Sequence, residues 1–129
     1  MKESRKVLLD TNFILTCVKQ KIDFFEDLQL RGFSIIIPLE VIKELKKIAE
    51  SKKKIRFKEA AELSLKLLKI NENLFKKIDL GGKKTTDKLI IDYSREHPDI
   101  AVATLDREIK EFLKNKKVVI RGKKRLEMI

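Results

Sequence analysis

The chain has very few of the side chains that build disulfides and zinc sites. Cys17 is its one cysteine and His97 its one histidine in 129 residues. A lone cysteine cannot form an intramolecular disulfide, and a zinc ribbon needs about four nitrogen or sulfur ligands. We therefore expect an intracellular, cytoplasmic protein without a zinc ribbon. Cys17 lies within the apolar stretch 13–18, so we expect it to be buried in the core.

Long hydrophobic runs and aromatic side chains are also scarce. No apolar run approaches the roughly 20 residues of a membrane span, and the run after the charged start is too short for a signal peptide. We therefore expect no membrane contact. Tryptophan is absent, tyrosine occurs once, and the seven phenylalanines stand mostly at core spacings. These residues show little sign of platforms on which nucleic-acid bases would stack.

Charge is what the chain has in excess. Charged residues make up 40% of it, and 31 Lys and Arg against 20 Asp and Glu leave a net charge of +11. Such an excess favours polyanionic partners, because binding releases their counterions. A highly charged solubilising surface accounts for the same balance. The hydrophobic fraction of 43% and the length of 129 residues predict one domain with one core, spanning residues 1–129.

Strand patterns alternate with helix patterns along the chain. We predict strands over residues 6–10, 33–37, 74–78, 100–104 and 118–120, the last being the final strand. We predict helices over residues 12–30 (with a break near 19–21), 39–50, 56–70, 85–96 and 106–115. Right-handed crossovers between such units give a parallel sheet covered on both faces. The predicted fold class is α/β, a three-layer α/β/α sandwich with a central parallel sheet of about five strands.

Two of the predicted helices carry an apolar face at helical spacing. In the helix over 39–50, the face consists of Val41, Ile42, Leu45, Ile48 and Ala49. In the helix over 56–70, the inward residues are predicted to be Ala60, Leu63, Leu67 and Leu68.

Four acidic side chains stand where they can reach one edge of such a sheet. Asp10 ends the first predicted strand, Asp106 follows the fourth, and Asp87 lies in the first turn of a helix. Glu44 lies about 40° beyond the apolar face of its helix, at the boundary with solvent. Ligands bind outside the carboxyl ends of parallel strands. Carboxylates gathered there repel one another, by roughly 4 kcal/mol for a pair about 4 Å apart, and a divalent metal relieves that repulsion.

Each of these acids also has an ordinary structural explanation. Asp10 and Asp106 can be helix caps, Asp87 a first-turn acid favoured by the helix dipole, and Glu44 a partner of Lys47. Taken singly, each acid favours the structural interpretation. The set of four, within an alternating α/β frame, favours a shared metal site.

Other reactive side chains fit such a site less well. Glu40 lies one turn from Glu44 and is a substitute for it, whereas Asp92 is less well placed. His97 stands next to a helix-ending proline, where surface capping is a better explanation than acid–base catalysis.

Four short motifs occur in an order that resembles the archaeal-type PIN-domain ribonuclease family. They span nearly the whole chain and read Val7-Leu8-Leu9-Asp10-Thr11-Asn12, Val41-Ile42-Lys43-Glu44-Leu45, Thr86-Asp87-Lys88-Leu89-Ile90 and Ala103-Thr104-Leu105-Asp106. The resemblance is closer to the PIN nucleases of small-subunit ribosomal RNA processing than to the VapC-type toxins. Members of that branch often carry two adjacent acids where this chain has Thr86-Asp87, so only Asp87 matches.

The resemblance implies a metal-dependent endoribonuclease that hydrolyses single-stranded RNA with Mg2+ or Mn2+, with a role in ribosomal RNA processing. The catalytic acids would be Asp10, Glu44, Asp87 and Asp106, of which Asp10, Asp87 and Asp106 would hold the metal. The secondary polar groups would be Asn12 and Thr104, which orient the ligands or a metal-bound water. A homodimer agrees with the resemblance, and two alternatives stay open: a VapC-type toxin, and a non-catalytic RNA-binding factor of ribosome assembly.

Basic residues beside the acids would bind the RNA backbone. Lys83 and Lys84 precede Asp87, Arg107 follows Asp106, and residues 52–56 could form a basic helical arm. For any single lysine, a solvated surface position is the simpler interpretation.

Overall fold

One mixed sheet organises the chain in this computed structural model, which describes residues 5–52, 55–122 and 124–129. The strand order is β3-β2-β1-β4-β5-β6. Neighbours from β3 to β5 pair in parallel, and β6 pairs antiparallel with β5. The strands are β1 (Arg5–Leu9), β2 (Phe33–Pro38), β3 (Phe75–Ile78), β4 (Ala101–Ala103), β5 (Lys117–Arg121) and β6 (Arg125–Met128).

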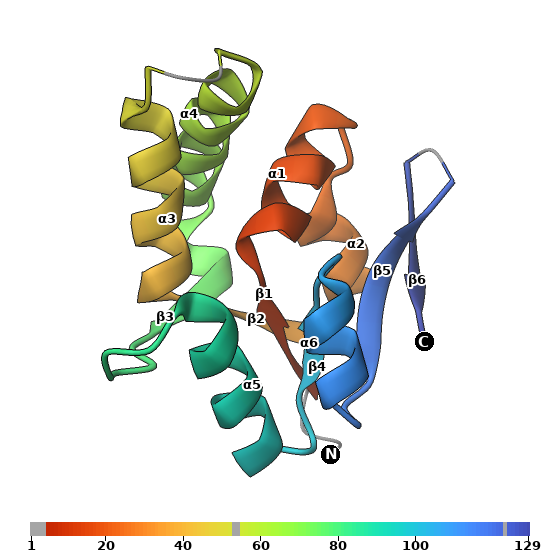
Figure 1. Ribbon diagram of the computed structural model, residues 1–129. Coiled ribbons are helices and arrows are strands. Elements are labelled where there is room, and N and C mark those ends of the chain that lie inside the picture. Colours follow the sequence, from red (N-terminus) through yellow and green to blue (C-terminus); the bar gives the residue numbers. More distant parts are fainter. Residues whose placement is uncertain (1–4, 53–54, 123) are drawn as a thin grey trace.

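Helices connect the parallel strands and cover the sheet. They are α1 (Thr11–Lys19), α2 (Phe24–Leu30), α3 (Leu39–Glu50), α4 (Ile55–Ile70), α5 (Thr86–Glu96) and α6 (Arg107–Phe112), with a 3-10 turn at Glu72–Leu74. Figure 1 shows α3 packed beside α4, and α5 next to α6. Three consecutive residues are buried in each of two strands, 7–9 in β1 and 35–37 in β2. Because successive side chains point to opposite faces, both faces of the sheet are covered there. The predicted α/β fold with a mostly parallel central sheet is confirmed.

Most predicted elements lie where the patterns put them. The helix predicted over 39–50 matches α3, and the break predicted near 19–21 separates α1 from α2. Lys21 in this break has a φ of 59°, a left-handed conformation that no helix continues through. Thr85 is the N-cap of α5, where its side chain accepts a hydrogen bond from the Lys88 amide. Cys17 is buried, as predicted.

Two predictions about the C-terminal part are wrong. The helix predicted to reach residue 115 ends at Phe112, and Asn115 is instead buried, donating hydrogen bonds to the carbonyls of Ser94, His97 and Ile100. The strand predicted over 118–120 is not the last, because β6 follows it. Segment 125–128 has only two apolar side chains, Leu126 and Met128, and alternation that short is too weak to predict a strand.

The predicted inward position of Leu63 is also wrong. Leu63 is 48% exposed, whereas Ala60, Ala61, Ser64 and Leu68 form the buried face of α4. The small side chains of Ala60, Ala61 and Ser64 leave room for α4 to pack against α1 and α3, and the Ser64 hydroxyl is satisfied by donating to the Ala60 carbonyl at 2.7 Å. The apolar pattern counted Leu63 as core because a buried face of alanine and serine has little hydrophobic signal.

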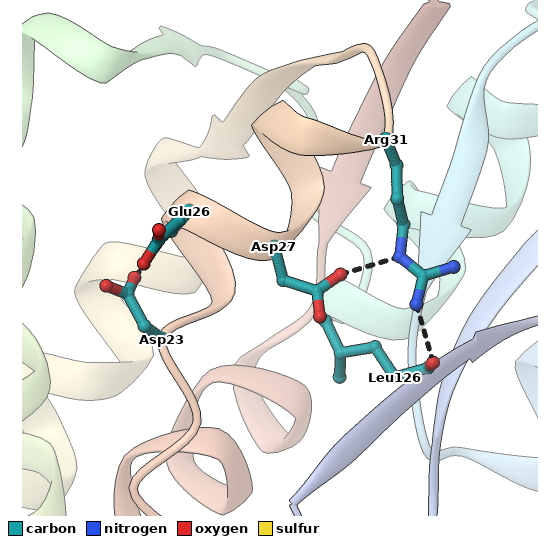
Figure 2. Close-up of polar contacts among 5 residues, drawn as sticks. All are labelled: Asp23, Glu26, Asp27, Arg31 and Leu126. Carbon is teal, nitrogen blue, oxygen red and sulfur yellow. Dashed lines mark hydrogen bonds and ion pairs between the residues drawn. The ribbon is translucent and has the colours of Figure 1, made fainter.

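Arg31, at the end of α2, ties that helix to the edge strand β6. Its Nε donates to Asp27 Oδ1 at 2.6 Å, and its Nη2 donates to the Leu126 carbonyl at 2.8 Å (Figure 2). The same guanidinium therefore joins one side chain of α2 to the backbone of a strand 95 residues away in sequence. This contact supplements the antiparallel pairing of β6 with β5.

We expect Arg31→Ala to lower the free energy of unfolding by about 1 kcal/mol, the typical value of a hydrogen bond from a charged donor after solvent exposure is discounted. Urea denaturation would measure the loss, and hydrogen exchange should quicken in β6. Arg121→Ala is the control, since it removes only the exposed Arg121–Glu127 pair and should cost less than about 0.5 kcal/mol. Equal effects from both variants would contradict the proposed anchoring of β6.

Candidate functional site

The pairing of β1 with β4 forms the centre of the site. Leu9 lies opposite Ala103, so the next residues along the two strands, Asp10 and Thr104, meet at the carboxyl edge of the sheet. The Asp10 amide donates to the Ala103 carbonyl at 3.0 Å. The Thr104 hydroxyl donates to Asp10 Oδ2 at 2.9 Å. Asp10 is only 3% exposed, so the sheet register holds a carboxylate inside the protein.

Asp10 also begins α1 and connects through it to α3. Asp10 Oδ1 accepts a hydrogen bond from the Thr11 amide at 2.8 Å, which makes Asp10 the N-cap of α1. The Thr11 hydroxyl then donates to Glu44 Oε1 at 2.6 Å. Glu44 therefore turns toward the sheet edge, as its boundary position predicts, and its hydrogen-bond partner is Thr11 rather than Lys47.

Asp106 is positioned by the same threonine that contacts Asp10. The Asp106 amide donates to Thr104 Oγ1 at 3.0 Å. Its side chain is the N-cap of α6, with Oδ1 accepting from the amides of Glu108 at 2.8 Å and Ile109 at 3.3 Å. Asp10 and Asp106 are thus both helix caps and members of one connected group, so the two interpretations of these residues are compatible.

Burial, more than neighbouring charge, shifts the pKa of Asp10. Burial raises the pKa of this carboxyl to about 6, against the hydrogen bonds from Thr104 and the Thr11 amide, which lower it. The negative charges of Asp87 and Glu44 raise the pKa further. The folded protein therefore holds Asp10 in surroundings that disfavour its charge.

Asp87 connects the remaining acids. Asp87 is exposed, but partial loss of solvent is still the largest cause that raises its pKa, followed by the charges of Asp106 and Glu44. A hydrogen bond with Asp106 and the charge of Glu108 act in the same direction. The structure thus brings the four predicted acids into one neighbourhood, where each is repelled by others. Their catalytic and metal-binding roles remain predictions.

Thr104 links Asp10 and Asp106 through its hydroxyl, so replacing it tests whether that link positions the two acids. Thr104→Val keeps the shape of this fully buried side chain but removes the hydroxyl that serves both Asp10 and Asp106. We expect the pKa of Asp10 to rise above 6 and the protein to lose about 1 to 3 kcal/mol of stability, because buried partners stay unsatisfied. Carbon-detected NMR titration and urea unfolding would measure the two effects. Thr16→Val, in α1 outside the site, is the control; an unchanged Asp10 titration in Thr104→Val would contradict the assignment.

Sequence patterns do not single out two further residues of the site. Thr11 follows Asp10 and has the appearance of an ordinary first residue of a helix, yet it positions Glu44. Glu108 lies in the first turn of α6, and its negative charge raises the pKa of Asp87. What both share is a place in the first turn of the helix that follows a strand, where the turn lies near the ligand edge of the sheet.

Other predicted residues lie around the acids without joining them. Asn12 is exposed, and the proposed substitute Glu40 accepts a hydrogen bond from the Leu80 amide at 3.2 Å instead. Asp92 pairs with Lys84 at 2.8 Å, in agreement with its lower ranking. The other basic candidates, Lys83 and Arg107, are exposed. Of the arm predicted at 52–56, residues 53 and 54 lie outside the described part of the chain.

The chemistry of these donors fits a divalent cation, although their arrangement is not a finished metal site. Carboxylate oxygens are the ligands that Mg2+ and Mn2+ prefer, and a cation would offset the burial and the repulsion that raise the pKa values of Asp10 and Asp87. Within the described residues, however, no three histidine, cysteine, aspartate or glutamate side chains are arranged to hold a metal ion. Both oxygens of Asp10 are engaged by Thr104 and Thr11. Each of these oxygens keeps a second lone pair, so Asp10 can accept both hydrogen bonds and still contact a cation.

Comparison with known proteins finds relatives that match nearly the whole chain. The PIN-like domain family matches residues 7–125. Ribonuclease VapC4 of Methanocaldococcus jannaschii is 31% identical over 129 aligned positions, covering 95% of each chain. The rRNA-processing protein fcf1 of Schizosaccharomyces pombe is 31% identical over 112 positions, which cover 84% of this chain and 53% of that protein. Among the helices described here, none is long and apolar enough to cross a membrane.

Solved structures share the fold. The PIN domain endonuclease Utp24 superposes with a TM-score of 0.76 at 24% identity, covering 98% of this chain and 92% of that one. The VapBC2 complex of Rickettsia felis contains a chain with a TM-score of 0.59 at 18% identity, covering 87% of this chain and 98% of that one. The extent of the family match, together with the 31% identity to VapC4 over 95% of both chains, leads to one conclusion: the chain belongs to the PIN-like domain family.

Proposed function

We propose that this protein is a Mg2+- or Mn2+-dependent endoribonuclease that hydrolyses phosphodiester bonds in single-stranded RNA. The observation that carries the proposal is that Thr104 and Thr11 bring Asp10, Asp106 and Glu44 together at the carboxyl edge of the sheet, where Asp87 is near enough to share a hydrogen bond with Asp106. A protein of net charge +11 that gathers acids in one place has the charge pattern of a metal site within a surface that attracts nucleic acid. The ribonuclease named among its relatives supports the same activity.

The residues of the site would have different roles, according to their positions. Asp10, Asp87 and Asp106 would hold the cation, and a bound Mg2+ or Mn2+ supplies a Lewis acid that lowers the pKa of water. Thr104 keeps the two strand-end carboxylates in register, and Thr11 directs Glu44 toward them. Lys83, Lys84 and Arg107 would contact phosphates beside the cleaved bond.

No side-chain base is required in this scheme, which suits a chain with one histidine. His97 caps the end of α5, where its Nδ1 lies 2.8 Å from the Tyr93 carbonyl and its ring stacks on Tyr93. The prediction that His97 caps a helix is thus confirmed.

Incubation of fluorescent single-stranded RNA with the protein in Mn2+ or in EDTA tests the proposal. We expect fragments in Mn2+ and intact RNA in EDTA, separated on a denaturing gel. Intact but shifted RNA in both buffers would overturn the enzymatic proposal and support the non-catalytic RNA-binding alternative.

The biological role that we favour is ribosomal RNA processing, because the motifs resemble that branch more than the VapC-type toxins and a relative of 31% identity carries that name. A VapC-type toxin is the second candidate, since another relative at the same identity is named Ribonuclease VapC4. Cleavage of a small-subunit precursor RNA fragment at one position, with transfer RNA left intact, would support processing. The reverse preference would support the toxin.

A further inference from the structure

A second group of side chains with an affinity for nucleic acid lies on α5 and α6, outside the acidic site. Phe112, the last residue of α6, is 52% exposed. The Arg95 guanidinium lies 5.8 Å from the centre of the Phe112 ring. Its Nε and Nη2 also donate to the Phe112 carbonyl at 3.3 and 3.2 Å. Arg95 therefore fixes the end of α6 while leaving much of the phenyl ring open to solvent.

Two lysines extend this surface: Lys84 lies just before α5, and Lys88 lies in its first turn. Lys84 pairs with Asp92 at 2.8 Å, and the hydrogen bond from Lys84 lowers the pKa of Asp92. The positive charges of Arg95 and Lys88 lower it as well, so all three cations lie around one carboxylate. A hollow of about 220 Å³ is lined by Lys84, Lys88, Ile91, Asp92, Arg95 and Phe112. We call the cations and the ring, Lys84, Lys88, Arg95 and Phe112, the α5–α6 patch.

The chemistry of the α5–α6 patch matches an unpaired nucleotide. Bases stack on aromatic rings irrespective of their sequence, and nearby cations attract the phosphates. The phenylalanine count alone shows little sign of such a platform, because most of these rings are in the core; Phe112 is an exception. An exposed aromatic ring braced by a cation has no role in the packing of the core.

The position of α5 connects the α5–α6 patch with the acidic site. Asp87 lies in the first turn of α5, and Arg95 lies eight residues further along the same helix. At the rise of an α-helix this separation is about 12 Å along the axis. RNA that presents one phosphate to the acids can therefore extend along α5 to Phe112.

We propose that the α5–α6 patch is a subsite for a nucleotide of single-stranded RNA that flanks the cleaved bond. Its base stacks on Phe112, while Lys84, Lys88 and Arg95 contact the adjoining phosphates. This inference rests on the proposed function, because it takes RNA as the substrate, but its test is a binding measurement without metal or cleavage.

Fluorescence anisotropy with a short labelled RNA in EDTA measures the stacking contribution. Phe112→Ala should weaken binding about tenfold, the typical effect of losing one stacked base. Phe112→Tyr retains an aromatic face and should bind within about twofold of the wild type. Phe57→Ala is the matched control, because Phe57 is 40% exposed on α4 with the Lys19 ammonium 4.7 Å from its ring centre. In Figure 1, the start of α4 and the α5–α6 pair lie at opposite ends of the molecule.

An RNA that lacks its bases separates stacking from charge. The wild type and Phe112→Ala should bind the abasic RNA equally, because no base remains to stack. Lys88→Gln should weaken binding to normal and abasic RNA alike and reduce the slope of log affinity against log salt by about one.

Three results would overturn the subsite: wild-type protein that does not bind RNA, Phe112→Ala that binds like the wild type, or Phe57→Ala that weakens binding as much as Phe112→Ala. Circular dichroism melts show whether each variant is folded, and Phe112→Tyr keeps the test valid if alanine unfolds α6. Binding that depends on Phe112 without cleavage in Mn2+ would support the subsite and refute the nuclease proposal. If Phe112→Ala cleaves and binds RNA like the wild type, the nuclease proposal is supported and the subsite is refuted.

Discussion

Asp10→Asn and Asp106→Asn should each reduce Mn2+-dependent RNA cleavage at least about a hundredfold. Residues that only orient metal ligands commonly contribute 10- to 100-fold, so loss of a ligand should cost no less. Asparagine retains an oxygen that can cap α1 or α6, and the fold should persist. The variants would therefore lose the negative charge that holds the cation while keeping the helices that position it. Gel-based initial rates at saturating Mn2+ measure the effect.

Asp99→Asn is the matched control for this loss. Asp99 is exposed and precedes β4, so it lies at the end of that strand opposite to Asp106. We expect cleavage by this variant at the wild-type rate. Persistent cleavage by purified, folded Asp10→Asn or Asp106→Asn would refute the assignment of the acidic cluster as the catalytic centre.

The fold was predictable where apolar pattern and packing agree. Residues 35–37 are continuously apolar because both sheet faces are covered there, and the residues of α3 have the spacing of one buried face. The pattern fails where contacts other than apolar burial decide the structure. Ser64 is in the core through a hydrogen bond to its own helix, and β6 is held by backbone pairing and by Arg31.

The candidate site was predictable to the level of its acids and no further. Asp10 and Asp106 follow strands that pair or neighbour one another in the sheet, so topology alone predicts their approach. The hydroxyls that organise them are different. The role of Thr104 depends on the register Leu9 to Ala103, and the role of Thr11 on how α3 packs against α1. Tertiary packing sets both, and no local spacing encodes it.

The same Asp10→Asn substitution that removes activity should make the metal-free protein more stable. Asp10 has a pKa of 3.8 in the absence of structure and about 6 in the folded protein. The folded state therefore binds this proton more tightly, so the stability that Asp10 contributes is fully present below pH 3.8 and is lost as the pH rises through 6. The gap between these pKa values corresponds to about 3 kcal/mol. The hydrogen bond with Thr104 should be weaker by about 1 kcal/mol in the variant. Asp10→Asn should therefore raise the free energy of unfolding by about 2 kcal/mol at pH 8 in EDTA.

Urea unfolding at pH 8 and pH 4 would measure this gain, which should nearly vanish at the lower pH because Asp10 is then protonated in the folded protein. Asp23→Asn is the control: Asp23 is the exposed N-cap of α2, and its replacement should change stability by less than about 0.5 kcal/mol at either pH. Adding Mn2+ should stabilise the wild type and leave Asp10→Asn unchanged, because only the former binds the cation at this position. A variant less stable than the wild type at pH 8 would mean that the buried charge is already compensated, and the reason for a cation at the sheet edge would disappear.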